Sequence, residues 1–427
     1  MTGTRPRAQT DGLVGCTVAT SSHLAAAEVV AESWRRLHAD APFRILLADV
    51  DAGSVPPGDE SLLSPADVGL DATELRIRRT IYHAWEYATS LKPVLVRHLL
   101  RQGAEVVVFT DADTDLHAPL DALAEQAAEA GVCLTPHVLS PLPADGRGPD
   151  EMHLLAHGVV NTGLVAVGRG GAPFVDWWTA RTRRDSLGLP GDGFLLDQRW
   201  ADLAPTQFGA RLVDDPGLNV AFWNLHERRL ERSGGRWTVN GVALRHFHFS
   251  GFDPEDPLTL THHALALPHR VALGDVPQAV PLLREYADRV LSAGQRRLRA
   301  AGGGFDATAA GRALAPRDRL LLREAVLAHE AGAAPAPPDP FDPAQSAAFA
   351  EFAGSPVARL PLSPQARARM RRVDRLSPDP GHMGRADRLA LRLPRAAVRH
   401  LGIPFHGLAA PSAAVLAEYG RRAAGPH

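Results

Sequence analysis

The sequence contains little cysteine and no long apolar run. Its 427 residues include two cysteines, Cys16 and Cys133, each within an apolar stretch. Two such thiols are typical of buried free cysteines in a reducing compartment rather than of a disulfide framework. No stretch reaches the ~18 apolar residues of a membrane-spanning helix. The first residues, Met1 to Arg7, are not followed by an apolar core, so we expect no secretory signal and a cytoplasmic protein.

Charge is balanced, and lysine is almost absent. The formal net charge is -2, so no overall basic field favours nucleic acid, and we expect no nucleic-acid partner. Arginine supplies the positive side chains everywhere except at Lys92, the one lysine of the sequence. A compact ammonium interacts differently from a planar guanidinium, which makes Lys92 a candidate binding residue. Chance retention of one lysine would leave the same pattern.

Apolar runs alternate with amphipathic segments in the first part of the chain. This alternation predicts an α/β fold with a mostly parallel central sheet. The strands expected from composition are 13–19, 43–48 and 105–110, with 158–167 forming two more, interrupted by Asn161-Thr162-Gly163. The expected helices are 20–38, a helical region over 72–89, one opened by Lys92-Pro93 and one opened by Pro119.

Carboxylates follow the apolar run 105–110. Side chains two residues apart on an extended chain share a face, so Asp111 and Asp113 can reach one cation if the strand geometry continues. Carboxylates suit Mg²⁺ or Mn²⁺, and such ions often also bind substrate phosphates. Ordinary turn and cap chemistry explains an Asp pair after a strand equally well.

Two histidines lie on one face of a later predicted strand, 244–251. His246 and His248 are two residues apart, with Phe247 and Phe249 on the other face. Imidazole is a good ligand for transition metals, whereas a lone buried histidine is more often structural. The pair is therefore a second candidate source of metal ligands.

Taken in order, these segments resemble the nucleotide-diphospho-sugar glycosyltransferases of the GT-A fold, particularly the bacterial members of the glycogenin and lipopolysaccharide-galactosyltransferase group. The resemblance covers about residues 13–262. It rests on Lys92-Pro93, Val108 to Asp113, Asn161-Thr162-Gly163, Asp197-Gln198, Asn219 to Leu225 and His248-Phe249-Ser250-Gly251. It implies a Rossmann-like domain with a mostly parallel sheet.

The resemblance also implies an activity and a set of site residues. The activity would be transfer of a sugar from a nucleotide-diphosphate sugar, with a UDP-sugar favoured, to an acceptor hydroxyl in glycan or glycoconjugate biosynthesis. Asp111, Asp113 and His248 would hold Mn²⁺ or Mg²⁺, with His246 as an alternative ligand. The implied catalytic residues are Asn161, Asp197 and Gln198, and the implied donor-binding residues are Ala19, Thr20, Ser22, His23, Lys92, Asp111, Ala112, Gly163 and Gly251.

Some features depart from that group or leave alternatives open. A Lys-Pro-Trp motif normally follows the His-aromatic-x-Gly segment, but here Phe252-Asp253-Pro254 follows. The charge of the phosphates must then be met elsewhere, and the candidates are Lys92, Arg245 and Arg270. If the reaction inverts, Asp197 would be the candidate general base, and if it retains, no protein base is required. The alternatives are a noncatalytic nucleotide-sugar binder or scaffold and, less favoured, a haloacid-dehalogenase-type phosphatase, whose signature expects Thr or Val where this chain has Asp115.

Composition divides the chain into further segments. We predict a flexible N-terminus over 1–12, a glycosyltransferase domain over 13–270, a helical extension over 271–332 and a Pro-rich linker over 333–347. Residues 348–427 are rich in Arg, Ala and Pro, which predicts a partly disordered tail. Its arginines could contact an anionic membrane surface, an acceptor or a partner.

Overall fold

The structure is a computed structural model, and it describes residues 12–50, 60–189, 193–263, 265, 267–295 and 307–355. The expected loop at 52–58, nearly all of the predicted flexible N-terminus and the tail beyond residue 355 lie outside the described residues. The chain divides into two compact units. The first comprises residues up to Leu75, Ala84–Gly188 and Gly193–Gly303, and the second comprises Arg76–His83, Leu189–Asp192 and the chain from Gly304.

A seven-stranded sheet forms the centre of the first unit, which confirms the predicted α/β class with a mostly parallel sheet. The strands pair in parallel except around β7, which runs antiparallel to both β4 and β6. In spatial order the strands are β10 (Arg211–Leu212), β6 (Val132–Pro136), β7 (Val160–Gly168), β4 (Val106–Thr110), β1 (Leu13–Ala19), β2 (Phe43–Leu47) and β3 (Leu62–Leu63).

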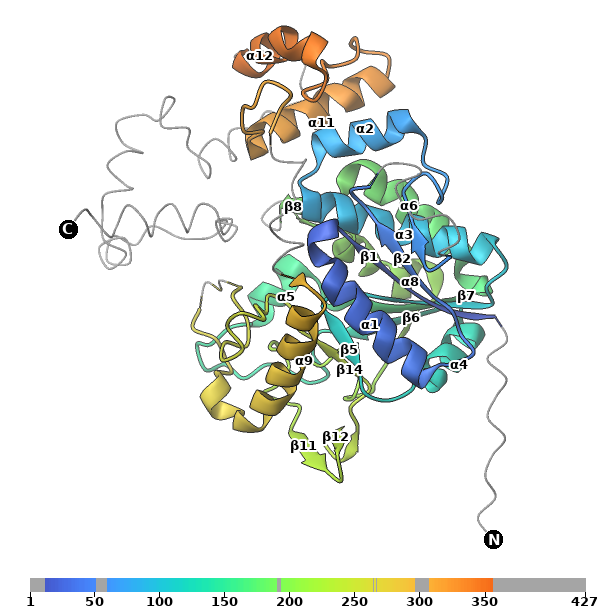
Figure 1. Ribbon diagram of the computed structural model, residues 1–427, viewed down its shortest axis with the longest axis vertical. Helices are drawn as coiled ribbons and strands as arrows, with labels where there is room; N and C mark the ends of the chain where they lie inside the picture. Colours follow the sequence, from blue (N-terminus) through green and yellow to red (C-terminus); the bar gives the residue numbers. More distant parts are fainter. Residues whose placement is uncertain are drawn as a thin grey trace, which may run out of the picture. The chain divides into compact units, whose positions relative to one another are not determined.

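Helices cover both faces of this sheet, because its central strands are apolar on both sides. Helices α1 (Leu24–Leu37) and α4 (Asp121–Ala130) pack on one face, and α3 (Ala84–Arg101) and α6 (Ala172–Asp185) pack on the other (Figure 1). Val106 and Val108 of β4 contribute to the core beneath α1 and α4. Both cysteines are buried and free, as the sequence predicts.

A second core lies on the other side of α1. Ala25, Ala26 and Val29 of α1 join a buried cluster with Phe247, Phe249 and residues of α9 (Val280–Ser292). One helix thus separates the two cores and fixes β14 (His246–His248) relative to the sheet. The smaller elements of this unit are β5 (Thr114–Leu116), α5 (Glu151–His157), β9 (Phe194–Leu195), α7 (Gln198–Ala201), α8 (Ala204–Phe208), β11 (Leu230–Ser233), β12 (Arg236–Val239) and β13 (Val242–Ala243). The first residue of β8 (Gly188–Leu189) belongs to this unit and the second residue to the other unit.

Three expected elements differ in the structure. The helical region predicted over 72–89 ends at Ile81 in α2 (Ala72–Ile81), and α3 then runs unbroken from Ala84 to Arg101. Pro93 therefore lies inside a helix and does not open one, although a proline there removes one backbone hydrogen bond. Its neighbours Leu91, Lys92 and Val94 are buried, and tertiary packing outweighs the local preference.

The third difference is in β7, where the two strands predicted over 158–167 form one continuous strand. The Asn161-Thr162-Gly163 segment does not end the strand. Instead, the pairing with β6 shifts register, from Leu134 opposite Val165 to Thr135 opposite Asn161. An irregularity of this kind redirects side chains without ending the strand.

The described part of the second unit is helical. It contains α11 (Pro316–Glu330) and α12 (Ser346–Gly354). Arg319 is buried there and donates hydrogen bonds to the backbone oxygens of Arg79 and Tyr82. The region predicted as one extension over 271–332 thus contributes α9 to the first unit and α11 to the second. No helix among the described residues is both long enough and apolar enough to span a bilayer.

Candidate active site

The sheet topology brings the polar residues together at one edge. β1, β2 and β4 run parallel, so their carboxyl ends lie at the same edge. β7 runs antiparallel to β4, so its first residues, Asn161 to Gly163, lie at that edge as well. The backbone N–H of Asp111 donates to the carbonyl of Gly163 at 2.9 Å. Ligands of open α/β sheets bind at such an edge.

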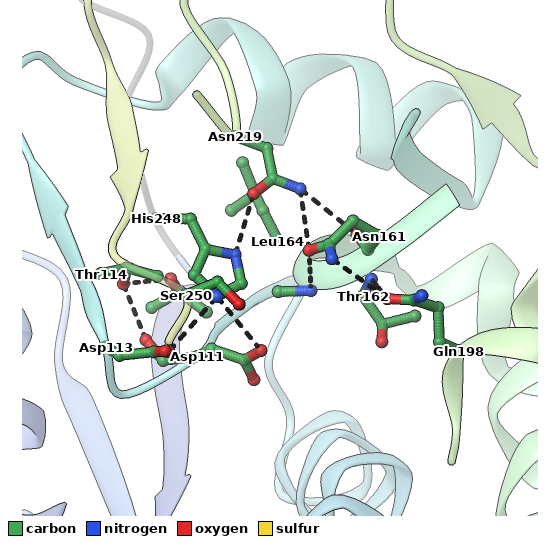
Figure 2. A network of polar contacts seen from close by, with 12 residues as sticks. Asp111, Asp113, Thr114, Asn161, Thr162, Leu164, Gln198, Asn219, His248 and Ser250 are labelled. Carbon is green, nitrogen blue, oxygen red and sulfur yellow. Dashed lines mark hydrogen bonds and ion pairs between the residues drawn. The ribbon is translucent and has the colours of Figure 1, made fainter. Parts of the chain in front are cut away.

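Three potential metal ligands converge there. Ligand atoms of Asp111, Asp113 and His248 all lie within 4.8 Å of one another. His248 Nε2 is 3.3 Å from Asp113 Oδ1 and 3.9 Å from Asp111 Oδ2. The His248 side chain is 4% exposed, whereas the Asp113 side chain is 39% exposed. The group is therefore buried at the imidazole and more exposed at Asp113. Figure 2 shows the three side chains close together.

A two-stranded ladder delivers His248 to the carboxylates. β14 pairs antiparallel with β5, with His248 opposite Thr114. The backbone N–H of Phe249 donates to the carbonyl of Asp113 at 2.8 Å. Residues about 135 positions apart in the sequence are thereby held in contact.

His246 does not join this group, contrary to its candidacy as an alternative ligand. Its Nε2 is 2.7 Å from Thr110 Oγ1, and its side chain is fully buried. Thr110 Oγ1 also lies 2.7 Å from Thr114 Oγ1, whose hydroxyl bonds the carbonyl of Asp111 at 2.7 Å. Burial lowers the pKa of His246 well below its ordinary value. His246 supports the backbone beneath the carboxylates.

Lys92 lies between two carboxylates. Its Nζ is 2.7 Å from Asp111 Oδ1 and 3.7 Å from Asp197 Oδ1. Burial lowers the pKa of Lys92, but Asp111 and Asp197 outweigh that effect and raise the pKa above its ordinary value. Burial raises the pKa of Asp197 to about 6, although the charge of Lys92 opposes the rise. Lys92 is thus a charged partner of Asp111, and Asp197 is a buried partner of Lys92.

Asp113 and His248 influence each other in the same way. Burial would raise the pKa of Asp113, but the neighbouring His248 and, more weakly, His23 hold that pKa well below its usual range. Burial would lower the pKa of His248, but Asp113 and Asp111 raise it. Without a cation, the imidazole takes the role of positive partner to the carboxylates.

Two of the predicted catalytic residues, Asn161 and Gln198, form a polar chain that continues to His248. Asn161 Nδ2 donates to Gln198 Oε1 at 3.1 Å, and Gln198 Nε2 donates to the carbonyl of His157 at 2.8 Å. Asn219 connects Asn161 Oδ1, at 3.0 Å, with His248 Nδ1, at 3.2 Å (Figure 2). The resemblance included Asn219 in a matching segment but gave it no role.

The turn after β1 is also built at this edge. Thr20 Oγ1 is 2.9 Å from Ser22 Oγ and 3.0 Å from His23 Nδ1. Asp49, after β2, accepts hydrogen bonds from the backbone N–H and hydroxyl of Ser21.

The alanines and glycines among the predicted site residues can contribute only their backbone groups or the space that a small side chain leaves. Ala19 and Ala112 pack into the core beneath α1, so only their backbone can contact a ligand. Gly251 has a φ of +67°, and a Cβ there would lie 2.6 Å from Thr261 Oγ1. A Cβ at Gly163 would lie 2.4 Å from Cε1 of His248. Gly163, which the resemblance gives as a donor-binding residue, therefore permits the close approach of the His248 side chain.

The donor set fits a hard divalent cation. Two carboxylates suit Mg²⁺ and Mn²⁺, and an imidazole nitrogen is a common ligand of transition metals. A metal-ligating histidine normally donates its other ring N–H to a neighbouring oxygen. His248 Nδ1 has such an oxygen in Asn219 Oδ1.

Comparison with known proteins gives distant similarities. No family model matches the sequence. The chain is 28% identical over 183 residues to the uncharacterized protein YfnD of Bacillus subtilis, a match that covers 39% of this chain and 54% of YfnD. The chain thus spans about half the length of that relative.

Solved structures that resemble the chain include two glycosyltransferases. The galactosyltransferase LgtC, in complex with donor and acceptor sugar analogs, is 14% identical with a TM-score of 0.39, covering 64% of this chain and 95% of LgtC. A glycosyltransferase involved in glycosylation of the major capsid of PBCV-1 is 11% identical with a TM-score of 0.31. The match covers 56% of this chain and 94% of the chain of that glycosyltransferase.

Proposed function

We propose that this chain is a metal-dependent glycosyltransferase that moves a sugar from a nucleotide-diphosphate sugar to an acceptor hydroxyl. The observation that carries the proposal is the convergence of Asp111, Asp113 and His248 at the carboxyl edge of the sheet. Mn²⁺ is favoured over Mg²⁺, because Mg²⁺ takes mostly oxygen ligands and one member of this set is an imidazole. When bound there, the cation would neutralise the charge of the donor diphosphate.

The residues around the cation site would bind and orient the donor. The turn Thr20 to His23 lies near enough to Asp113 for His23 to lower the pKa of that carboxyl, and we assign the nucleoside to this turn. UDP is the expected donor nucleotide. Asn161 and Gln198 would orient the transferred sugar or the acceptor through hydrogen bonds.

We propose that Asp197 positions Lys92, and that Lys92 pairs with Asp111. The Asp197 side chain is 1% exposed, and Lys92 lies between it and Asp111. Because a general base must come within hydrogen-bond reach of the acceptor hydroxyl, this burial favours Asp197 as a positioning residue for Lys92. The positively charged Lys92 ammonium then pairs with the Asp111 carboxylate and stabilises negative charge next to that carboxylate.

Calorimetric titration tests the proposal. UDP, GDP, ADP and TDP would be titrated with and without Mn²⁺ into the wild type and into Asp113→Asn. We expect selective binding of UDP that requires Mn²⁺ and is lost in the variant. Asp121→Asn is the matched control, because Asp121 is also 39% exposed and also pairs with a histidine, His38 Nδ1, at 3.2 Å.

The outcomes separate the candidate functions. A folded wild type that binds none of the four nucleotides contradicts the proposal. Mn²⁺-dependent UDP binding without transfer or hydrolysis of any UDP-sugar would instead indicate the noncatalytic nucleotide-sugar binder.

A further inference from the structure

The side chain of Asn219 contacts His248, although Asn219 belongs neither to β14, which carries His248, nor to β5, which pairs with β14. Asn219 is fully buried and lies in a loop that pairs with β14: the backbone N–H of Val220 donates to the carbonyl of His246 at 3.0 Å, and the N–H of His248 donates to the carbonyl of Val220 at 2.8 Å. Asn219 has a φ of +50°, a conformation that asparagine tolerates better than most residues. Its side chain therefore has a fixed position beside the imidazole.

Backbone groups determine which end of each amide is oxygen. The N–H of Gly163 can only donate, and it lies 2.9 Å from Asn161 Oδ1, so that atom is the acceptor. The carbonyl of His157 can only accept, and it lies 2.8 Å from Gln198 Nε2, so Gln198 Oε1 faces Asn161 Nδ2. Two independent backbone groups thus assign the same orientation to Asn161.

The orientation of Asn219 follows from that of Asn161. The Asn219 atom 3.0 Å from Asn161 Oδ1 must be the NH₂ group, which also donates to Thr135 Oγ1 at 2.9 Å. The other end is then Oδ1, which can only accept, and it lies 3.2 Å from His248 Nδ1. Asn219 Oδ1 can therefore only accept a proton carried by His248 Nδ1, and in the Nδ1–H tautomer the lone pair of Nε2 faces Asp111 and Asp113. Asp113 Oδ1, 3.3 Å from Nε2, competes for the proton until a cation takes its place.

We propose that Asn219 is a positioning residue that fixes His248 in the Nδ1–H tautomer and so prepares Nε2 as a metal ligand. The amide chain from Gln198 through Asn161 to Asn219 transmits this polarity from two backbone groups to the imidazole (Figure 2). The proposal deepens the proposed function, because it concerns the same cation site, but the tautomer of the neutral imidazole can be observed in metal-free protein.

The tautomer and the metal affinity can be measured separately. Protein with ¹⁵N-labelled histidine, free of metal, would be studied by long-range ¹H–¹⁵N NMR at a pH where His248 is neutral, with the His248 signals identified by their loss in His248→Gln. Mn²⁺ affinity would be measured by electron paramagnetic resonance of the free ion. We expect the Nδ1–H tautomer in the wild type.

Two variants separate tautomer control from structural support. Asn219→Gly removes the acceptor and accepts the positive φ without strain; we expect a mixture of tautomers and Mn²⁺ binding weakened ~10- to 100-fold, as for other outer-shell partners of metal ligands. Asn219→Asp keeps the acceptor toward Nδ1 and loses the donor toward Asn161; we expect it to retain the tautomer and the Mn²⁺ affinity. A residue with a merely structural role would change stability in both variants without changing the tautomer.

The outcomes distinguish this inference from the proposed function. An Nε2–H tautomer in the wild type, or an Asn219→Gly variant with unchanged tautomer and unchanged Mn²⁺ affinity, overturns the inference. A wild type that shows the Nδ1–H tautomer but binds no Mn²⁺ overturns the metal-dependent function and supports the tautomer assignment alone.

Discussion

Gly163 lies directly against the ring of His248, with room for no further carbon atom: a Cβ at residue 163 would be 2.4 Å from Cε1 of His248 and 2.6 Å from Asn161 Oδ1. The strand that carries Asn161 therefore also sets the position of the imidazole. Because both side chains belong to the polar chain of the candidate site, one methyl group at this position would disturb both.

Gly163→Ala is expected to lower stability and to weaken metal binding. Overpacking of a close-packed site costs ~1–3 kcal/mol, and displacement of His248 removes one ligand from its place. Urea unfolding and Mn²⁺ titration measure the two effects. Gly170→Ala is the control, because a Cβ there meets only Gly131 at 3.6 Å; equal behaviour of the two variants would contradict the prediction.

Lys92→Met is expected to destabilise the protein by about 3 kcal/mol, because removing one partner of a buried ion pair leaves the other uncompensated. The double variant with Asp197→Asn should recover part of the loss. Chemical unfolding measures both. Arg101→Met is the control, since its pair with Asp176 is more than half exposed, and such pairs contribute ~0–1 kcal/mol. A loss no larger than that of the control would show that the Lys92 pair contributes little.

His246→Gln and His248→Gln should separate stability from metal binding. His246 bonds Thr110 and is not a member of the ligand group, so its replacement should change the free energy of unfolding and leave Mn²⁺ affinity within about threefold. Loss of His248 removes a ligand and should weaken Mn²⁺ binding by at least ~10-fold, since even outer-shell changes reach that size. Reversal of this order in a Mn²⁺ titration would indicate that His246 is the ligand.

Stability should rise with pH between about 4 and 6.5 partly because of His137. Burial, with a smaller contribution from the charge of His157, lowers the pKa of His137 to about 3. The unfolded chain has an ordinary histidine pKa near ~6.5, so between these values it binds the proton that the folded protein excludes. The free energy of unfolding should fall by about 2 kcal/mol from pH 7 to pH 5 through this group.

His137→Gln should flatten this pH dependence relative to the wild type. Urea unfolding at a series of pH values measures the slope. His153, whose pKa burial also lowers to about 3, should retain part of the dependence. An identical slope in the variant and the wild type would show that folding does not lower the pKa of His137.

Local patterns predicted much of the fold. The apolar runs at 13–19 and 43–48 are strands β1 and β2, and the run before Asp111 is β4. The same patterns missed the continuity of α3 through Pro93 and of β7 through Gly163. Proline and glycine are read locally as breaks, but in both places contacts with distant segments stabilise the continuous element.

The sequence by itself determined which chemistry is available: an Asp pair after a buried strand, a single lysine, and two histidines on one face of a later strand. Only the tertiary structure decided which of these groups meet. The antiparallel insertion of β7 brings Asn161 to the edge where β4 ends, and the pairing of β14 with β5 places His248 beside the carboxylates, whereas His246 bonds Thr110. Asn219 meets His248 because the loop at Val220 pairs with β14. Periodicity along a chain defines which side chains share a face, but the pairing of segments far apart in sequence decides which faces meet.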